Sequence, residues 1–300
     1  MLLTEFISRG VSALGPLYPG AEARQIVLML CESLLGTRSY THIVDPGYVI
    51  DRNKLPVLES SLKRLSEGEP LQYVTGRALF CDRDFHVGPG VLIPRPETEI
   101  LAREALDIAK RIARMRVPYG RNAVPVRILD LCCGSGCLSW TLALDVPGSK
   151  VTAVDISEEA LSIAKSQPFN EAARAGRASV PVFRRADILD MSGQSFSGEY
   201  DLIVSNPPYI MESERAQMRR NVLDYEPSIA LFVPDEDPLV FYRAIAEWSV
   251  RYLAPGGKGL TEINEQLGPE TLKVFRNCGF AECELVKDFY DKNRFVYYSK

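Results

Sequence analysis

The tetrapeptide Asn206-Pro207-Pro208-Tyr209 combines residue types suited to chemistry on a planar amine. It follows the apolar run 201–205, which is typical of a short buried strand, and open α/β sheets bind ligands where their strands end. Proline has no N–H, so this loop should expose carbonyl oxygens and few donors. The side-chain oxygen of Asn206 and the carbonyl of Pro207 would then form an acceptor pair for an –NH2 group, beside the flat ring of Tyr209. The alternative is an ordinary polar turn, because Asn-Pro is a common turn signal.

A glycine-rich turn supplies a second group of candidate residues. The predicted strand 126–131 is followed by Gly134 and Gly136, which would let a helix N-terminus approach a ligand closely. Asp155 ends the next predicted strand, about twenty residues on, where a carboxylate accepts hydrogen bonds from ribose hydroxyls. Asp187 ends a third strand, where it would meet an adenine amine or serve as an ordinary loop aspartate. The pattern predicts an adenosine-containing cofactor, but does not separate NAD from S-adenosylmethionine.

The acceptor pair of Asn206 and Pro207 favours S-adenosylmethionine over NAD as the cofactor. Hydride transfer has no need of two acceptors that grip an amine, whereas methyl transfer to an amide nitrogen does. Holding both N–H groups on Asn206 and Pro207 would point the nitrogen at a sulfonium methyl group and stabilise the charge that grows there. No general base is required in the transition state, because the alkylated nitrogen can lose its proton afterwards. Asn206 and Pro207 are therefore the candidate catalytic residues, and S-adenosylmethionine is the predicted cofactor.

Composition limits the class of protein. The 300 residues carry a net charge of −4, with 46% hydrophobic and 25% charged residues, as in an ordinary globular protein. The acidic balance disfavours bare DNA as the main partner, and we expect no signal peptide and no membrane span. Seven unevenly spaced cysteines fit a reducing cytoplasm. The cluster Cys132, Cys133 and Cys137 lacks a paired C-x-x-C and a nearby histidine, so buried thiols fit better than zinc and we expect no metal.

Periodicity and turn signals predict three regions. The first seventy-odd residues show helical spacing, with helices expected near 5–14, 21–35 and 56–67. From Val126 onward strands, including one expected at 180–187, alternate with helices, including one expected to begin at Pro238, which predicts a doubly wound, mostly parallel α/β sheet. The expected domains are a helical domain at 1–76, a hairpin connector at 77–94 and an α/β domain at 95–300.

The chain resembles the PrmC/HemK family, the methyltransferases that modify the glutamine of the Gly-Gly-Gln motif in class-1 peptide chain release factors. The resemblance covers nearly the whole chain and is carried by segments 70–76, 91–99, 201–210, 225–231 and 253–257. Asn-Pro-Pro-Tyr alone is shared with DNA adenine and some ribosomal RNA methyltransferases. The Pro-Arg-Pro-Glu-Thr-Glu and Gln-Tyr-Val-Thr-Gly segments are much more specific to this family.

The resemblance implies a class I, Rossmann-like methyltransferase with a small N-terminal helical domain that docks the release factor. We expect a cytoplasmic monomer, with no membrane or direct nucleic-acid partner. The implied cofactor residues are Cys132, Cys133, Gly134, Ser135, Gly136, Asp155, Asp187, Ile188 and Asn206. The implied substrate-binding residues are Asn206, Pro207, Pro208 and Tyr209.

The chain departs from the family pattern at three places. Cys132 and Asn264 each replace a usual glycine, and 232–234 with Pro238 replaces a glycine-rich turn. A non-glycine residue at positive φ is strained. We therefore expect Cys132 to have a negative φ, which leaves the close approach of the backbone to Gly134 and Gly136.

Two other functions remain open from the residues alone. An amino-group methyltransferase of nucleic acid, acting on adenine N6 or ribosomal guanine N2, would bring a flipped base to the same acceptor pair. A non-catalytic cofactor-binding module is the other alternative, which the complete Asn-Pro-Pro-Tyr sequence disfavours.

Overall fold

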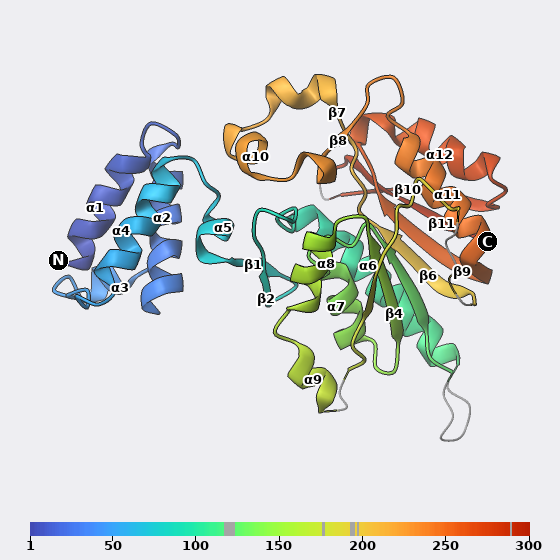
Figure 1. Cartoon of the computed structure of the whole chain (residues 1–300), viewed down its shortest axis with the longest axis horizontal. Coiled ribbons are helices and arrows are strands. Elements are labelled where there is room, and N and C mark those ends of the chain that lie inside the picture. The colour runs from blue at the N-terminus through green and yellow to red at the C-terminus, as the bar shows by residue number, and fades with distance from the viewer. Residues whose placement is uncertain (117–123, 176–177, 193–195, 197, 289) are drawn as a thin grey trace. The chain divides into compact units, whose positions relative to one another are not determined.

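The computed structural model of the chain describes residues 1–116, 124–175, 178–192, 196, 198–288 and 290–300, and Figure 1 shows the course of the chain. These residues divide into two units. The helical unit comprises Met1–Arg77 and Arg219–Tyr225, and the α/β unit comprises Ala78–Met218 and Glu226–Lys300. Over these described ranges, no helix has the length and apolar character needed to cross a membrane.

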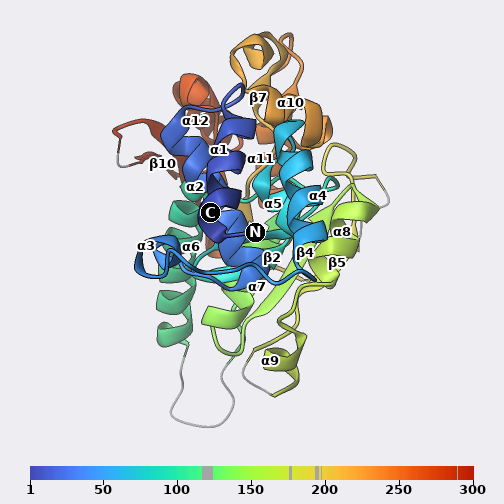
Figure 2. The ribbon, with the colours of Figure 1, turned by 90° about the vertical axis from the view of Figure 1, so that its left-hand side faces the viewer.

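The helical unit is built on three helices that contact one another in pairs (Figure 2). Phe6, Leu30 and Leu58, one from each helix, are fully buried between them. Gly10 permits a close approach of the first two, because an added Cβ would lie 2.8 Å from Val27. The three predicted helices are confirmed. The helices are α1 (Leu3–Leu14), α2 (Gly20–Leu35) and α4 (Leu55–Ser66), with the shorter α3 (Thr41–Val44) and α5 (Leu71–Thr75).

A short helix from far along the chain, α10 (Arg220–Tyr225), also belongs to the helical unit. Arg219 forms an ion pair with Glu22 of α2 at 2.6 Å. The Tyr225 hydroxyl donates to the backbone carbonyl of Glu67 at 3.0 Å. The chain then returns to the α/β unit at the next residue.

A seven-stranded sheet forms the centre of the α/β unit, in the order β10-β11-β9-β6-β3-β4-β5. The five strands from β9 to β5 pair in parallel, and β11 runs antiparallel to both of its neighbours. The predicted doubly wound, mostly parallel sheet is confirmed. The chain order reverses at β3, between β4 and β6, which is where such sheets bind ligands. The strands are β3 (Arg127–Leu131), β4 (Lys150–Asp155), β5 (Val182–Arg185), β6 (Tyr200–Ser205), β9 (Leu253–Glu262), β10 (Glu282–Lys287) and β11 (Asn293–Ser299).

Helices cover both faces of the sheet (Figure 1). Neighbouring residues of a strand point to opposite faces, so Ile128 packs in the core under α6 and α7 while Leu129 packs in the core under α11 and α12. On the first face lie α6 (Pro96–Met115), α7 (Cys137–Asp145) and α8 (Glu158–Lys165), and on the second lie α11 (Val240–Tyr252) and α12 (Gly268–Asn277).

Two sequence-based boundaries are corrected. The strand expected at 180–187 spans only Val182–Arg185, because only these residues pair with β4. The helix expected to begin at Pro238 begins at Val240. The expected hairpin forms, since β1 (Arg77–Phe80) pairs with β2 (Arg83–His86). The remaining elements are α9 (Asn170–Arg174), β7 (Ile210–Met211), β8 (Phe232–Val233) and the 3₁₀ helices η1 (Glu212–Gln217), η2 (Ser228–Ala230) and η3 (Glu265–Leu267).

Candidate active site

A cavity of about 220 Å³ lies where β3, β4 and β6 end. It is acidic: Asp155 and Asp187 line it, and no lysine or arginine does among the described residues. The predicted cofactor residues that line it are Cys132, Cys133, Gly134, Ser135, Asp155, Asp187, Ile188 and Asn206. Sequence reasoning missed the apolar part of the wall, which includes Val91, Leu92, Pro94, Pro227, Ile229, Ala230 and Phe241.

The glycine-rich turn differs from expectation at Cys132. Its φ is +62°, so the expectation of a negative φ is wrong. The N–H of Cys133 donates to Val154 of β4 at 3.0 Å, which ties the turn to the sheet directly after the left-handed residue. Such a conformation costs a non-glycine residue about 1 kcal/mol. At Gly134 an added Cβ would meet no protein atom within 4 Å, so the backbone itself faces open space.

Gly136 is the one predicted cofactor residue that does not line the cavity. It is the N-cap of α7 at φ +76°. An added Cβ there would lie 3.1 Å from both Ala164 and Phe183. This glycine allows close packing behind the turn, rather than contact with a ligand in front of it.

Asp155 has two roles in the geometry of the turn. One carboxylate oxygen accepts the N–H of Gly134 at 2.8 Å, and the other accepts the N–H of Ser157 at 3.0 Å. Burial raises the pKa of this carboxyl, and these backbone donors oppose the shift. Asp187 closes a turn by accepting the N–H of Leu189 at 2.9 Å. The two carboxylates are therefore held by backbone donors at the edge of the cavity.

Asn206 directly follows β6 and is anchored by one end of its amide. Its Nδ2 donates to the hydroxyl of Thr98, near the start of α6, at 3.0 Å. Within the described parts of the chain, no hydrogen bond engages Asn206 Oδ1 or the carbonyl oxygen of Pro207. Both acceptors inferred from the sequence are therefore without a hydrogen-bond partner among these residues.

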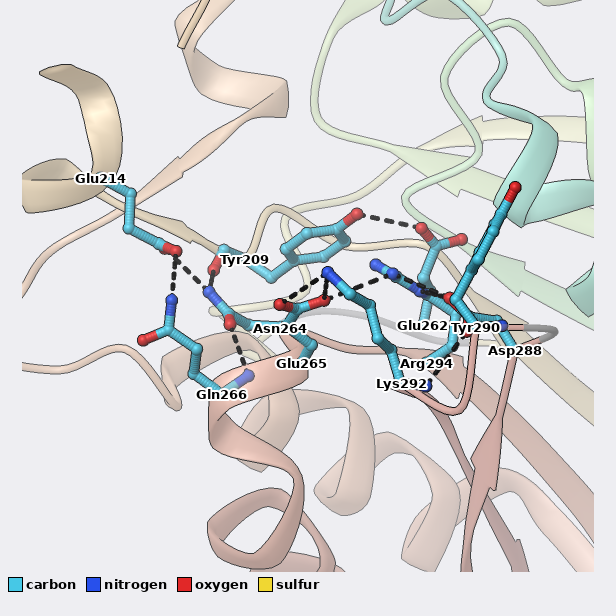
Figure 3. Close-up of polar contacts among 10 residues, drawn as sticks. All are labelled: Tyr209, Glu214, Glu262, Asn264, Glu265, Gln266, Asp288, Tyr290, Lys292 and Arg294. Carbon is cyan, nitrogen blue, oxygen red and sulfur yellow. Dashed lines mark hydrogen bonds and ion pairs between the residues drawn. The ribbon is translucent and has the colours of Figure 1, made fainter. Parts of the chain in front are cut away.

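The rest of the tetrapeptide is less exposed to the cavity. Pro208 lines it, but Pro207 and Tyr209 do not belong to its wall. The Tyr209 ring turns toward β9, where its hydroxyl donates to Glu262 at 3.0 Å (Figure 3). Burial and the neighbouring carboxylate raise the pKa of Tyr209 well above its ordinary value.

Glu262, the last residue of β9, lies behind the tetrapeptide and was missed by sequence reasoning. Its carboxylate is 1% exposed and accepts from Thr98 at 2.9 Å as well as from Tyr209. Burial raises its pKa to about 7, although its hydrogen bonds and Arg294 oppose the shift. One buried carboxylate therefore connects Asn206, through Thr98, with Tyr209.

A second buried carboxylate, Glu226, holds two segments that line the cavity. It pairs with Arg95 at 2.6 Å and accepts the N–H of Ile93 at 3.0 Å. Ile93 lies between the lining residues Leu92 and Pro94, and Glu226 precedes the lining residue Pro227. The ion pair thus gives Arg95, which lies between two prolines, a role in holding the cavity wall.

Comparisons with known proteins agree with this geometry. Residues 96–224 match the model of the methyltransferase small domain. The release factor glutamine methyltransferase of Bacteroides thetaiotaomicron is 39% identical over 95% of this chain and 95% of its own length. That of Flavobacterium psychrophilum is 33% identical over 99% of this chain and 98% of its own.

Among solved structures, the hMettl16 catalytic domain in complex with a MAT2A 3′UTR hairpin matches with a TM-score of 0.52 and 12% identity. The match covers 83% of this chain and 82% of that one, and at this identity it supports the fold alone. The α/β unit has the class I methyltransferase fold. With relatives of such identity along almost its entire length, the chain belongs to the family of release factor glutamine methyltransferases.

Proposed function

We propose that the protein transfers a methyl group from S-adenosylmethionine to the side-chain amide nitrogen of the glutamine in the Gly-Gly-Gln motif of class-1 release factors. The observation that carries the proposal is the acceptor pair, Asn206 Oδ1 and the Pro207 carbonyl, which no described residue satisfies. A primary amide has two N–H donors that match these acceptors. The names of the relatives support a release factor as the protein that presents the glutamine.

The cavity fits the proposed cofactor. Asp155 would accept from ribose hydroxyls and Asp187 from the adenine amine, while the backbone at Gly134 leaves room for close approach. A wall with carboxylates and without lysine or arginine among its described residues suits a cation better than a pyrophosphate. When bound, S-adenosylmethionine supplies an electrophilic methyl group.

The chain's own residues orient the amide. Asn206 and Pro207 would each accept one amide N–H, which directs the nitrogen lone pair toward the cavity. The same two oxygens stabilise positive charge on the nitrogen as the new bond forms. Pro208 shapes the apolar wall beside them. The proton leaves to solvent after transfer, so no base is assigned.

The decisive experiment incubates the protein with labelled S-adenosylmethionine and a purified release factor, then maps the label by mass spectrometry. We expect one methyl group on the motif glutamine. A release factor with that glutamine replaced by alanine is the matched control and should take up no label. Label on another residue, or on DNA or ribosomal RNA offered in parallel but not on the release factor, would contradict the proposal.

We also propose that residues 1–76 form a recognition domain for the release factor, joined through 77–94 to a catalytic domain at 95–300, and that the enzyme is a cytoplasmic monomer. A truncated chain that begins at Arg77 should bind S-adenosylmethionine but methylate the intact release factor less efficiently. Unchanged cofactor affinity, measured by calorimetry, is the control for folding. Equal efficiency of both chains on the intact factor would refute a docking role.

A further inference from the structure

We propose that Glu262 is a positioning residue that sets the orientation of the Asn206 side-chain amide through the hydroxyl of Thr98. The proposal rests on the proposed function, because it concerns how the acceptor for the substrate amide is presented. The three groups form a hydrogen-bonded chain: Asn206 Nδ2 donates to Thr98 Oγ1 at 3.0 Å, and Thr98 Oγ1 donates to Glu262 Oε2 at 2.9 Å.

The hydrogens available to each group determine which group donates in each of the two hydrogen bonds. A threonine hydroxyl has one hydrogen to donate, and a carboxylate can only accept. Thr98 must therefore give its hydrogen to Glu262, and its oxygen is left to accept. Only the NH2 end of the Asn206 amide can meet that oxygen with a donor. In the flipped amide two acceptor oxygens would face each other.

Burial makes this constraint effective. Thr98 is 2% exposed and Glu262 1%, so water has little access to replace a missing partner. The consequence at the other end of the amide is that Asn206 Oδ1 faces away from Thr98, without a partner among the described residues. The carboxylate thereby prepares an acceptor for the substrate without touching the substrate itself.

The second oxygen of Glu262 reinforces the arrangement. Oε1 accepts from the Tyr209 hydroxyl at 3.0 Å (Figure 3). One carboxylate therefore holds Tyr209 directly and Asn206 through Thr98. Both of its oxygens are then occupied by hydroxyl donors from other segments. Glu262 cannot turn toward one donor without losing the other.

Protonation of Glu262 would weaken its hold on the orientation of the Asn206 amide. A carboxylic acid has a hydrogen of its own to donate, so Thr98 would no longer have to donate to Glu262. The charged and titratable groups around it are Arg294 on β11, Glu97 on α6, Tyr209 in the tetrapeptide and Tyr242 on α11. Burial raises the pKa of Glu262 to about 7, so its titration falls in an accessible range. We expect turnover to fall as the pH is lowered through this range.

The test is a double-mutant cycle with Glu262→Gln and Thr98→Val in the full-length enzyme, with methylation of the release factor as the assay. Each substitution alone should lower kcat at least about tenfold, and leave KM for the release factor within about twofold. The double variant should be no slower than Thr98→Val alone, because the valine has already broken the connection. Thr98→Ser keeps the hydroxyl and should restore most of the turnover lost in the valine variant.

Thr271→Val is the matched control, since Thr271 is a fully buried threonine of α12 whose hydroxyl has no partner within the described residues. It should not change kcat. Glu262→Gln should also remove the low-pH loss of turnover. The proposal is overturned if Glu262→Gln keeps a kcat within twofold of the parent enzyme, or if the two losses multiply in the double variant. An inactive parent enzyme would instead refute the proposed function, so the two failures are distinguishable.

Discussion

Asn264 donates its side-chain N–H to the backbone carbonyl of Tyr209 at 3.1 Å, which joins the end of the tetrapeptide to the segment after β9 (Figure 3). The same NH2 group donates to Glu214 of η1 at 2.8 Å. The family pattern has glycine at this position, and a glycine can make neither contact. This chain therefore has a connection from β9 to both the tetrapeptide and η1 that depends on one side chain.

Replacing Asn264 by glycine should destabilise the protein by about 1–3 kcal/mol, because it removes the side-chain donor to the Tyr209 carbonyl, removes one of the donors to Glu214 and adds freedom to the unfolded chain. Urea denaturation measures the change in free energy of unfolding. Gln266→Ala is the control, since the Gln266 side chain donates to Glu214 only, at an exposed site, and its loss should cost less. Equal losses in the two variants would show that the contact with Tyr209 contributes nothing.

Cys132 provides a direct test of backbone strain. Its φ of +62° penalises any side chain, while its thiol packs against the neighbouring core. Cys132→Ala removes the thiol and keeps the strain, whereas Cys132→Gly removes both. We expect the glycine variant to be more stable than the alanine variant by roughly 1 kcal/mol, as measured by urea denaturation. An alanine variant as stable as the glycine variant, or more so, would refute the strain.

The raised pKa of Glu262 also affects stability. Its pKa lies near 4.5 in the unfolded chain and about 7 in the folded protein, so between these values the folded state binds more protons. The free energy of unfolding should therefore decrease as the pH rises through this window. Glu262→Gln removes this dependence, so the variant should gain stability relative to the parent from pH 5 to pH 8. Urea denaturation at pH 5, 6, 7 and 8 tests this, and a constant difference would contradict it.

Local sequence patterns predicted those site residues that lie at the end of a single strand or directly after it. The strand ending at Ser205 placed Asn206 at the sheet edge, and Asp155 was found in the same way. Glu262 had no such signal: it is a single acid at a strand end, 53 and 164 residues from its partners Tyr209 and Thr98. Only the folded sheet brings these three together.

The error at Cys132 has a different origin. The prediction gave Cys132 a negative φ, on the ground that the close approach of the backbone could be left to Gly134 and Gly136 alone. The turn instead uses a positive φ at Cys132, Gly134 and Gly136, although only two of these are glycines. The hydrogen bond from Cys133 to Val154 comes from a neighbouring strand, and a local sequence pattern contains no information about it.

Asn206→Ala should lower kcat by about two orders of magnitude or more, because it removes the acceptor that orients the substrate amide. The affinity for S-adenosylmethionine should change much less, since seven other predicted residues and an apolar wall also line the cavity. Asp155→Ala should do the reverse and weaken cofactor binding more than binding of the release factor. Asp190→Ala is the control for the Asp155 variant, because Asp190 is exposed, accepts from Ser192 at 2.8 Å and lies outside the cavity wall. Calorimetry of cofactor binding combined with single-turnover methylation separates these effects, and an Asn206→Ala enzyme with near-normal turnover would remove the basis of the proposed mechanism.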